Sequence, residues 1–143
     1  MYYTEEDIDF TILDGSRFEE LCYDLLVRTG FYSAKWKQGG SDNGRDIECY
    51  FTVSNPLLGF YNDRWFVECK NHANAINVTD LSTKLAWANA EKPNHLLIIT
   101  SSYLSKSTFE WLGKMKENAY YRIHVIEGKR LKEILLGYED LIR

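Results

Sequence analysis

Residues 95–100, HLLIIT, form a short, continuous apolar run between two longer helical patterns. Strands that are covered on both faces have this composition, because neither face contacts water. The run is much shorter than the roughly 18 to 20 apolar residues that a membrane helix requires. It therefore predicts a central strand, parallel to its neighbours, and the rest of the chain must supply helices for both faces of a sheet.

Helical and strand-like patterns alternate along the whole chain of 143 residues. The expected helices are 14–29, 79–92, 104–117 and one or two short ones within 128–142; the expected strands are 31–37, 45–51, 64–70, 95–100 and 123–126. Turn-rich segments at 38–44 and 55–63 separate the first three strands, which can pair as a meander. We therefore predict an α/β fold, a mixed central sheet flanked by helices on both faces, built as a single domain from residues 1–143.

The first predicted helix has one apolar stripe with helical spacing. Its members are Phe18, Leu21, Cys22, Leu25 and Leu26. Ser16 is a candidate N-cap, and Gly30 is expected to end the helix. At 100° per residue, Glu19 falls on the border of the stripe and Glu20 falls opposite it, so only Glu19 can reach inward.

Composition excludes several classes of protein. The net charge of −4 argues against a protein that coats nucleic acid, because such binding needs a surplus of Lys and Arg. Three cysteines without metal-binding spacing are interpreted as reduced core thiols. The acidic start, MYYTEEDIDF, lacks the pattern of a secretory signal, so we expect a cytoplasmic protein with no membrane association.

Three ionisable residues carry the most informative pattern. Side chains alternate across a strand, so Glu68 and Lys70 share one face of their predicted strand, and Asp46 opens the strand before it. If these two strands are neighbours, Asp46 and Glu68 can converge with Lys70 beside them. Carboxylate oxygens suit a hard cation such as Mg²⁺, which can activate water and stabilise charge on a phosphodiester.

Glu-x-Lys alone is a weak motif, because it occurs twice in this chain. The second pair, Glu127 and Lys129, follows a strand beside Gly128 and lacks an upstream Asp strand, so we assign it to a surface loop. The first pair follows a glycine-rich turn, an Asp that opens a strand and a further apolar strand. That context favours the first pair as the functional one.

The segments FEELCYDLLVRTGF, GGSDNGRDI, WFVECK, HLLIITSSYLS and IHVIEGKRLKEIL occur in this order. Together they resemble the Mrr-type branch of the PD-(D/E)xK restriction-endonuclease superfamily, from about residue 14 to residue 136. The resemblance implies a restriction-endonuclease-like fold and a metal-dependent nuclease site made of Asp46, Glu68 and Lys70. It also implies an acid from the first helix, which Glu19 matches. Many members of this branch carry Gln where Glu68 stands, so the chain follows the wider superfamily pattern here.

Several other residues have both a functional and a structural interpretation. Asp42 matches the turn of the family, but Asp in such turns commonly caps its own backbone. Glu48 lies on the face of Asp46, either as a further ligand or, as we expect, facing solvent. Lys84 is placed beside the apolar stripe of its helix, within reach of the site or snorkelling to solvent. Arg45 and Gln38 can contact phosphate or remain ordinary loop residues.

The histidines receive no role. His72, His95 and His124 are scattered along the chain without an HxH or HxxxH pattern. We therefore expect them neither to bind a metal nor to act as a general base.

These residues and the family resemblance together imply a nuclease that hydrolyses DNA with Mg²⁺, for which Mn²⁺ can substitute. Asp46, Glu68 and Glu19 are the expected metal ligands and, with Lys70, the catalytic residues. DNA is the expected partner, with self-association or fusion to a sensor or ATPase module, in restriction or antiphage defence. Two alternatives remain: an RNase or junction nuclease on the same fold, and a catalytically silent nucleic-acid-binding or oligomerisation domain.

Overall fold

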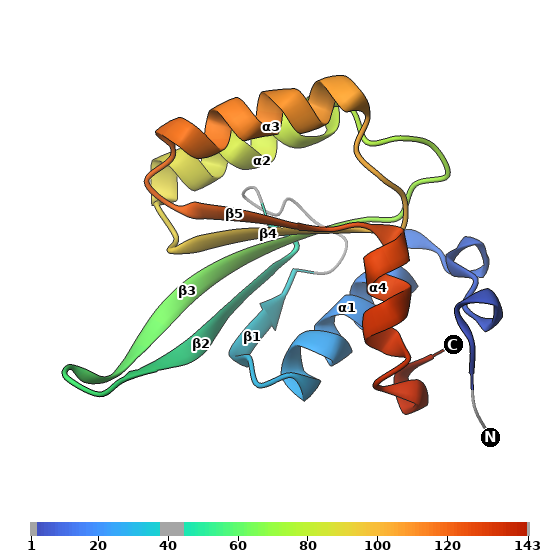
Figure 1. Ribbon diagram of the computed structural model, residues 1–143, viewed down its shortest axis with the longest axis horizontal. Helices are drawn as coiled ribbons and strands as arrows, with labels where there is room; N and C mark the ends of the chain where they lie inside the picture. The colour runs from blue at the N-terminus through green and yellow to red at the C-terminus, as the bar shows by residue number, and fades with distance from the viewer. Residues whose placement is uncertain (1–2, 38–44, 143) are drawn as a thin grey trace.

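The computed structural model describes residues 3–37 and 45–142 and contains a mixed five-stranded sheet in the order β1-β2-β3-β4-β5 (Figure 1). The strands are β1 (Tyr32–Trp36), β2 (Ile47–Asn55), β3 (Gly59–Lys70), β4 (His95–Thr100) and β5 (Arg122–Ile126). The first three pair antiparallel as the predicted meander, whereas β4 and β5 run parallel to β3. The predicted α/β fold is confirmed.

Helices cover both faces of the sheet. They are α1 (Gly15–Arg28), α2 (Val78–Glu91), α3 (Lys106–Asn118) and α4 (Gly128–Leu135), with single 3-10 turns at Glu5–Asp7, Phe10–Ile12 and Glu139–Leu141. Figure 1 shows α2 and α3 together on one face and α1 with α4 on the other. Connections through α2 and α3 explain the parallel strands, because the chain must return along the sheet between β3, β4 and β5.

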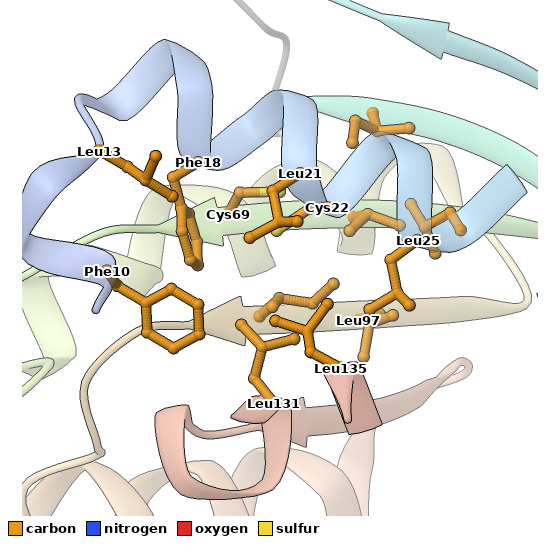
Figure 2. Packing of buried hydrophobic residues seen from close by; sticks show 14 of the residues in the cluster. Phe10, Leu13, Phe18, Leu21, Cys22, Leu25, Cys69, Leu97, Leu131 and Leu135 are labelled. Atoms are coloured by element: carbon orange, nitrogen blue, oxygen red, sulfur yellow. The ribbon is translucent and has the colours of Figure 1, made fainter. Parts of the chain in front are cut away.

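Each face has its own hydrophobic core. The cluster under α1 and α4 includes Phe18, Leu21, Cys69, Leu97 and Leu131 (Figure 2). The cluster under α2 and α3 includes Phe66, Leu85, Ile98 and Leu112. Burying each large apolar side chain contributes about 1.5 to 3 kcal/mol. β4 supplies side chains to both clusters, as the apolar run predicts, and its bounds are those expected.

The ends of α1 differ in part from the prediction. Asp14, rather than Ser16, is the N-cap, because its side chain accepts a hydrogen bond from the Arg17 backbone N–H at 2.8 Å. Gly30 follows the helix with a φ of 108°, a left-handed conformation that glycine adopts without strain. The predicted stop is therefore confirmed, and the predicted cap is wrong by two residues.

The second turn region is much shorter than predicted. Residues 55–63 were expected to be turn-rich, but β2 and β3 pair without a break from Ile47 opposite Val67 to Asn55 opposite Gly59. Only three residues, 56–58, connect the strands. Asn55 closes this turn, since its Oδ1 accepts hydrogen bonds from the backbone N–H groups of Leu57 and Leu58.

The three cysteines are free and buried, as predicted. Burial, with a smaller effect of the Glu48 charge, raises the pKa of Cys49 to about 12. The pKa of Cys69 is also raised, first by its hydrogen bond with Cys22 and then by burial. Cys49 and Cys69 are therefore unreactive thiols at neutral pH. Across residues 3–37 and 45–142, no helix has the length and apolar character needed to cross a membrane.

Candidate active site

Asp46 stands directly before β2, and β3 holds its carboxylate in place. Its Oδ2 accepts a hydrogen bond from the backbone N–H of Cys69 at 2.7 Å. Its own backbone N–H donates to the carbonyl of Val67 at 2.9 Å. The residue is 8% exposed. The carboxylate is thus fixed against β3 at the residue between Glu68 and Lys70.

Glu68 and Lys70 form an ion pair on β3, with 3.4 Å between Oε1 and Nζ. A second ammonium comes from α2, where Lys84 Nζ lies 3.5 Å from Glu68 Oε2. Glu68 is only 2% exposed, so it has left water almost completely. A carboxylate buried to this degree needs opposite charge nearby to remain ionised, and the two lysines supply it.

The strand pattern and the fold explain why these groups meet. Residues 64, 66, 68 and 70 of β3 share one face, and this face is the one that α2 covers, because Phe66 belongs to the core under α2. Lys84 lies on the side of α2 that packs on the sheet, one turn before the buried Ala88. Of the two interpretations given to Lys84, snorkelling to solvent does not describe it, since its side chain is 15% exposed and contacts Glu68.

Glu19 lies on α1 and is half-buried, whereas Glu20 is exposed, as the helical wheel predicts. Glu19 Oε1 accepts a hydrogen bond from the indole N–H of Trp36 on β1 at 3.0 Å. The indole therefore orients the Glu19 carboxylate. α1, which carries Glu19, covers the face of the sheet opposite the one covered by α2, which carries Lys84 (Figure 1).

The donor set suits a hard divalent cation in part. Asp46 and Glu68 provide carboxylate oxygens, and Mg²⁺ is commonly held by one or two carboxylates while water and substrate phosphate complete its shell. Among the residues that the structure describes, no group of three or more His, Cys, Asp or Glu is arranged to hold a metal ion. The two carboxylates therefore fit a cation shared with substrate better than a closed protein site.

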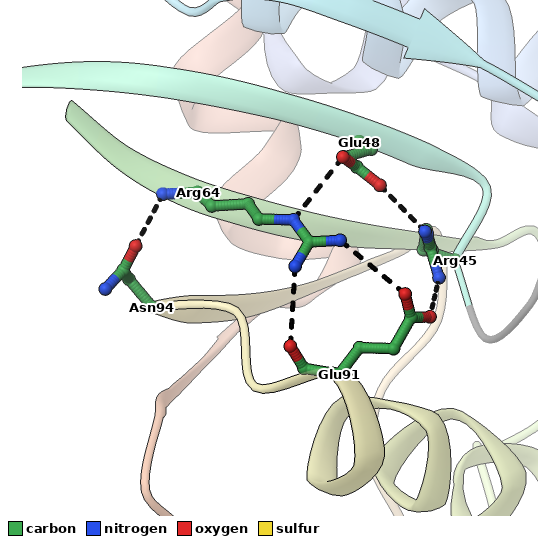
Figure 3. A network of polar contacts seen from close by, with 5 residues as sticks. All are labelled: Arg45, Glu48, Arg64, Glu91 and Asn94. Atoms are coloured by element: carbon green, nitrogen blue, oxygen red, sulfur yellow. Dashed lines mark hydrogen bonds and ion pairs between the residues drawn. The ribbon is translucent and has the colours of Figure 1, made fainter.

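Glu48 belongs to a different cluster (Figure 3). Its carboxylate contacts the guanidinium of Arg45 at 2.8 Å and that of Arg64 at 3.4 Å. Glu91, near the end of α2, contacts the same two arginines, Arg64 at 3.6 Å and Arg45 through a short hydrogen bond. Both guanidinium groups also lie over the ring of Phe66, 4.1 and 4.6 Å from its centroid. We call Arg45, Glu48, Arg64 and Glu91 the arginine network.

The arginine network corrects two expectations. Glu48 does not face solvent, since its side chain is 13% exposed and paired with two arginines. Burial alone would raise the pKa of Glu48, but hydrogen bonds from Arg64 and Arg45 outweigh it and leave this pKa below its usual value. Arg45 is 5% exposed and forms ion pairs with Glu48 and Glu91. In this structure Arg45 is therefore neither an ordinary solvated loop residue nor an exposed side chain placed to contact phosphate.

The second Glu-x-Lys pair does not form a loop. Glu127 is the N-cap residue of α4, and Gly128 and Lys129 begin that helix. Glu127 Oε2 accepts a hydrogen bond from the backbone N–H of Leu104 at 2.7 Å. Glu127 therefore connects the start of α4 to the segment before α3, and the pair lies at a helix end rather than on a surface loop. Gln38 and Asp42 lie outside the described residues.

Two of the histidines meet in the fold. His95 is the first residue of β4 and His124 is the third residue of the parallel strand β5, and their Nδ1 and Nε2 atoms are 3.0 Å apart. The other nitrogen of His95, Nε2, lies 2.7 Å from Asp63 Oδ2, and Trp65 stacks on the His95 ring at 4.0 Å. Burial, followed by the charge of His95, lowers the pKa of His124. Sequence spacing missed this cluster because strand register creates it.

Polar residues just beyond β3 and β4 were also missed. The side chain of Asn71 donates to the carbonyl of Leu13 at 2.8 Å, and Ser101 Oγ donates to Asn71 Oδ1 at 2.7 Å. These bonds fix the chain that follows Lys70, beside a cavity of about 510 Å³ that includes His72 and Lys132. Their position at the carboxyl ends of parallel strands is the signal that could have identified them, because ligands gather there in α/β sheets.

Comparison with known families gives one match over most of the chain. Residues 11–135 match the family model Mrr_cat, described as a restriction endonuclease. None of the curated proteins matches the chain.

Two solved structures share the fold. The DNA modification-dependent restriction endonuclease AspBHI aligns with a TM-score of 0.63 at 12% identity, over 99% of this chain and 40% of that one. The MspJI restriction endonuclease, solved in complex with a 27-mer oligonucleotide, aligns with a TM-score of 0.67 at 13% identity, over 89% of this chain and 29% of that one. The chain thus spans less than half the length of either protein.

Proposed function

Because this chain belongs to the Mrr_cat family of restriction endonucleases, we propose that it hydrolyses phosphodiester bonds of DNA at Asp46, Glu68 and Lys70. One observation carries the assignment of the site. Asp46 is bonded at 2.7 Å to the backbone N–H of Cys69, between the Glu68 and Lys70 side chains, which are themselves 3.4 Å apart. Two carboxylates and an ammonium are therefore concentrated around three consecutive residues of β3.

In this proposal Asp46 and Glu68 hold a divalent cation, Mg²⁺ or Mn²⁺. When bound, such a cation lowers the pKa of a coordinated water and stabilises negative charge on the phosphate. Asp46 is well suited to hold a fixed position, because its carboxylate is already bonded to β3. Glu68 lies 3.4 Å from the ammonium of Lys70 and 3.5 Å from that of Lys84, and opposite charges at this range favour the carboxylate form that binds a cation.

Lys70 has the second role. Its side chain is 20% exposed, against 3% for that of Glu68, so its ammonium lies where the buried site opens toward solvent. An ammonium at this place can stabilise the charge that develops on the phosphate during cleavage. Lys84 acts through Glu68 as a positioning residue. Glu19, held by the indole of Trp36, is proposed as an outer carboxylate and further ligand.

DNA is preferred over RNA because both structural neighbours are restriction endonucleases, one described as DNA modification-dependent. The same neighbours support a role in restriction or antiphage defence. Since the chain matches only 40% and 29% of their lengths, we propose that target recognition needs a further module or partner. The net charge of −4 agrees with this, because the chain has no surplus of cations for phosphate contacts.

A cleavage assay tests the proposal. Wild-type protein is incubated with Mg²⁺ or Mn²⁺ and with supercoiled, linear and single-stranded DNA and RNA, beside the variants Asp46→Asn, Glu19→Gln and Glu20→Gln. We expect DNA cleavage that EDTA abolishes, a loss of at least about 10³-fold in Asp46→Asn and about tenfold or more in Glu19→Gln. The exposed neighbour variant Glu20→Gln should cleave like wild type.

Circular dichroism spectra of all variants must match wild type for the assay to be read. Cleavage of RNA without cleavage of DNA would show that the substrate is RNA and would contradict the proposed DNA substrate. If wild type and Asp46→Asn give the same traces, with no nucleic acid cleaved by either protein, a catalytically silent binding domain would be favoured instead.

A further inference from the structure

Exposed cations gather around one exposed ring where α2 and α3 end and where β4 and β5 begin. Figure 1 shows these four ends together at the left of the molecule. Lys92 is the C-cap residue of α2, and Lys116 lies in the last turn of α3. Tyr120 lies two residues before Arg122, the first residue of β5. All four side chains are exposed, and we call Lys92, Lys116, Tyr120 and Arg122 the basic aromatic patch.

Contacts place the members of the patch side by side. The Nζ of Lys92 lies 5.5 Å from the centroid of the Tyr120 ring, which is a cation–π contact. Lys116, Tyr120 and Arg122 line one cavity of about 500 Å³, and His124 lines it too. Burial is the main cause that lowers the pKa of His124, and the charges of Lys116 and Arg122 add to it. The patch is therefore one surface and not four scattered side chains.

The three cations of the patch have no carboxylate partner among the residues that the structure describes. Of the described residues that line this cavity and the cavity beside it, Asp63 is the only acid, and its Oδ2 lies 2.7 Å from Nε2 of His95. The whole chain carries a net charge of −4, so three such cations at one place form a local positive surface. A surface of this kind attracts an anion.

Aromatic rings adjoin the cations. The cavity beside the patch has a volume of about 560 Å³ and shares Tyr120 and Arg122 with the first one. Phe51, Tyr61 and Trp65 also line it. Tyr120 is 89% exposed and Tyr61 44%, so these two rings can be reached from solvent. Proteins that hold single-stranded nucleic acid combine the same two elements, because bases stack on rings while cations contact phosphates.

Lys92 has a backbone conformation that helix stability does not explain. Its φ is 53°, in the left-handed region, where glycine avoids the cost that a side chain brings. A cation near a helix C-terminus is favourable, but this gain is no larger than the cost of the left-handed backbone. The ammonium of Lys92 is thus placed over Tyr120 at a cost to the fold, as is common for residues that bind a ligand.

A single strand of DNA fits this surface better than duplex DNA or an acidic peptide. In a duplex the bases stack on one another, so their faces are not available to Tyr120 and Tyr61. An acidic peptide would use the cations and leave the rings without a partner. Single-stranded DNA uses both, and DNA is the substrate class proposed above for this chain.

We propose that the basic aromatic patch binds a single-stranded segment of DNA, whose bases stack on Tyr120 and whose phosphates contact the three cations. The choice of DNA rests on the proposed nuclease function, and the patch adds a contact away from the cleavage site. Trp65, which lines the adjoining cavity, lies five residues before Lys70 on β3, roughly 17 Å away at about 3.3 Å per residue.

Fluorescence anisotropy with a labelled single-stranded DNA of about ten nucleotides tests this contact. EDTA is present throughout, so binding is measured without metal-dependent cleavage. We expect wild type to bind, and Tyr120→Ala to bind at least about fivefold more weakly because it removes a stacking ring. Tyr120→Phe, which keeps a ring, should bind like wild type. The matched control is Phe60→Ala, which should also bind like wild type, because this ring is 79% exposed but residues 52–62 contain no charged side chain.

The salt dependence of binding tests the cations separately. Three phosphate contacts predict a slope of about −2 for the logarithm of the binding constant against the logarithm of the salt concentration, at about −0.7 for each contact of a single strand. Arg122→Ala should reduce this slope to about −1.4, whereas Tyr120→Ala should leave it unchanged. The matched control is Lys114→Ala, because Lys114 is turned about 200° around α3 from Lys116, and it should bind like wild type.

Absence of binding by wild type, equal losses in Tyr120→Ala and Phe60→Ala, or an unchanged slope in Arg122→Ala would overturn the proposal. Equal affinity for a duplex of the same sequence would overturn the role given to the ring. Binding of an oligoglutamate peptide without binding of the oligonucleotide would assign the patch to an acidic protein partner instead. Binding in EDTA with no cleavage in Mg²⁺ would contradict only the nuclease function, whereas cleavage without the expected losses in binding would contradict only the patch.

Discussion

Two clusters of buried charge lie between the sheet and α2, and each combines two acids with two bases. In the arginine network, Glu48 and Glu91 are held by Arg45 and Arg64. In the proposed site, Asp46 and Glu68 lie with two lysines, Lys70 and Lys84. α2 contributes to both, because Lys84 and Glu91 are about two helical turns apart.

The bases make the difference between the clusters. Each guanidinium of the arginine network bridges two carboxylates and also packs on Phe66, so every group has a fixed orientation. The lysines lie 3.4 and 3.5 Å from Glu68, about as far as Arg64 lies from its two carboxylates, but an ammonium has neither the planar fork nor the ring contact that orients a guanidinium. The arginine network is therefore suited to stabilising the fold, whereas the ammonium groups beside Glu68 leave this carboxylate more able to exchange partners.

The largest expected effect separates the clusters by activity. Lys70→Ala should reduce DNA cleavage by about 10²- to 10³-fold, because it removes a charge proposed to stabilise the transition state. Arg64→Ala, which removes a cation from the arginine network, should cleave at a rate within about threefold of wild type at a temperature where it is folded. Single-turnover rates measure both. Equal losses would show that the two clusters do not differ in role.

The free energy of unfolding should depend more on the arginine network than on the proposed site, which is the reverse of the order expected for cleavage. Glu48→Ala is expected to lower the free energy of unfolding by about 3 kcal/mol, because the guanidinium of Arg45 loses one of its two carboxylate partners in a buried position. Lys70→Ala should cost less, about 1 to 2 kcal/mol, since Lys84 remains as a second ammonium beside the buried Glu68 carboxylate. Urea unfolding followed by circular dichroism compares them. A larger loss in Lys70→Ala than in Glu48→Ala would contradict the assignment.

The smallest effect is a pH dependence. The pKa of Glu48 is lowered in the folded protein, so the folded state binds fewer protons than the unfolded state near that pKa. Its contribution to stability is complete above the ordinary glutamate pKa of about 4.5 and is lost as pH falls through the lowered value. Wild type should therefore lose stability more steeply than Glu48→Gln below about pH 4.5 in urea unfolding. Parallel curves would contradict the cause given for this pKa.

Much of the fold follows from local sequence pattern. The run at 95–100 predicts β4 with its bounds, and the stripe of the first helix separates Glu19 from Glu20, because periodicity reflects which face meets the core. The sequence analysis did not predict that β2 continues to Asn55 and that β3 begins at Gly59. Turn-forming residues such as Asn55, Pro56 and Gly59 are expected both in a long loop and in the tight turn of a long hairpin. Cross-strand pairing, which local composition does not encode, decides how far the strands continue.

Part of the candidate site is also predictable, because side-chain periodicity indicates which residues share one face of a strand or helix. Alternation on β3 places Glu68 and Lys70 on one face, and the structure keeps them there. The arginine network could not be predicted, because Glu91 joins Arg45 only through the packing of α2 on the sheet. The contact between His95 and His124 likewise depends on the register of β4 and β5. Local sequence pattern does not predict contacts between elements that are distant in the sequence.

Metal binding is the most direct measurement of the central claim, that Asp46 and Glu68 form a cation site whereas Glu48 does not. Isothermal titration calorimetry with Mn²⁺ compares wild type with Asp46→Asn, Glu68→Gln and Glu48→Gln. The account predicts that the first two variants bind Mn²⁺ at least about tenfold more weakly, and that Glu48→Gln binds like wild type. Unchanged binding in Asp46→Asn and Glu68→Gln, or an equal loss in Glu48→Gln, would contradict it.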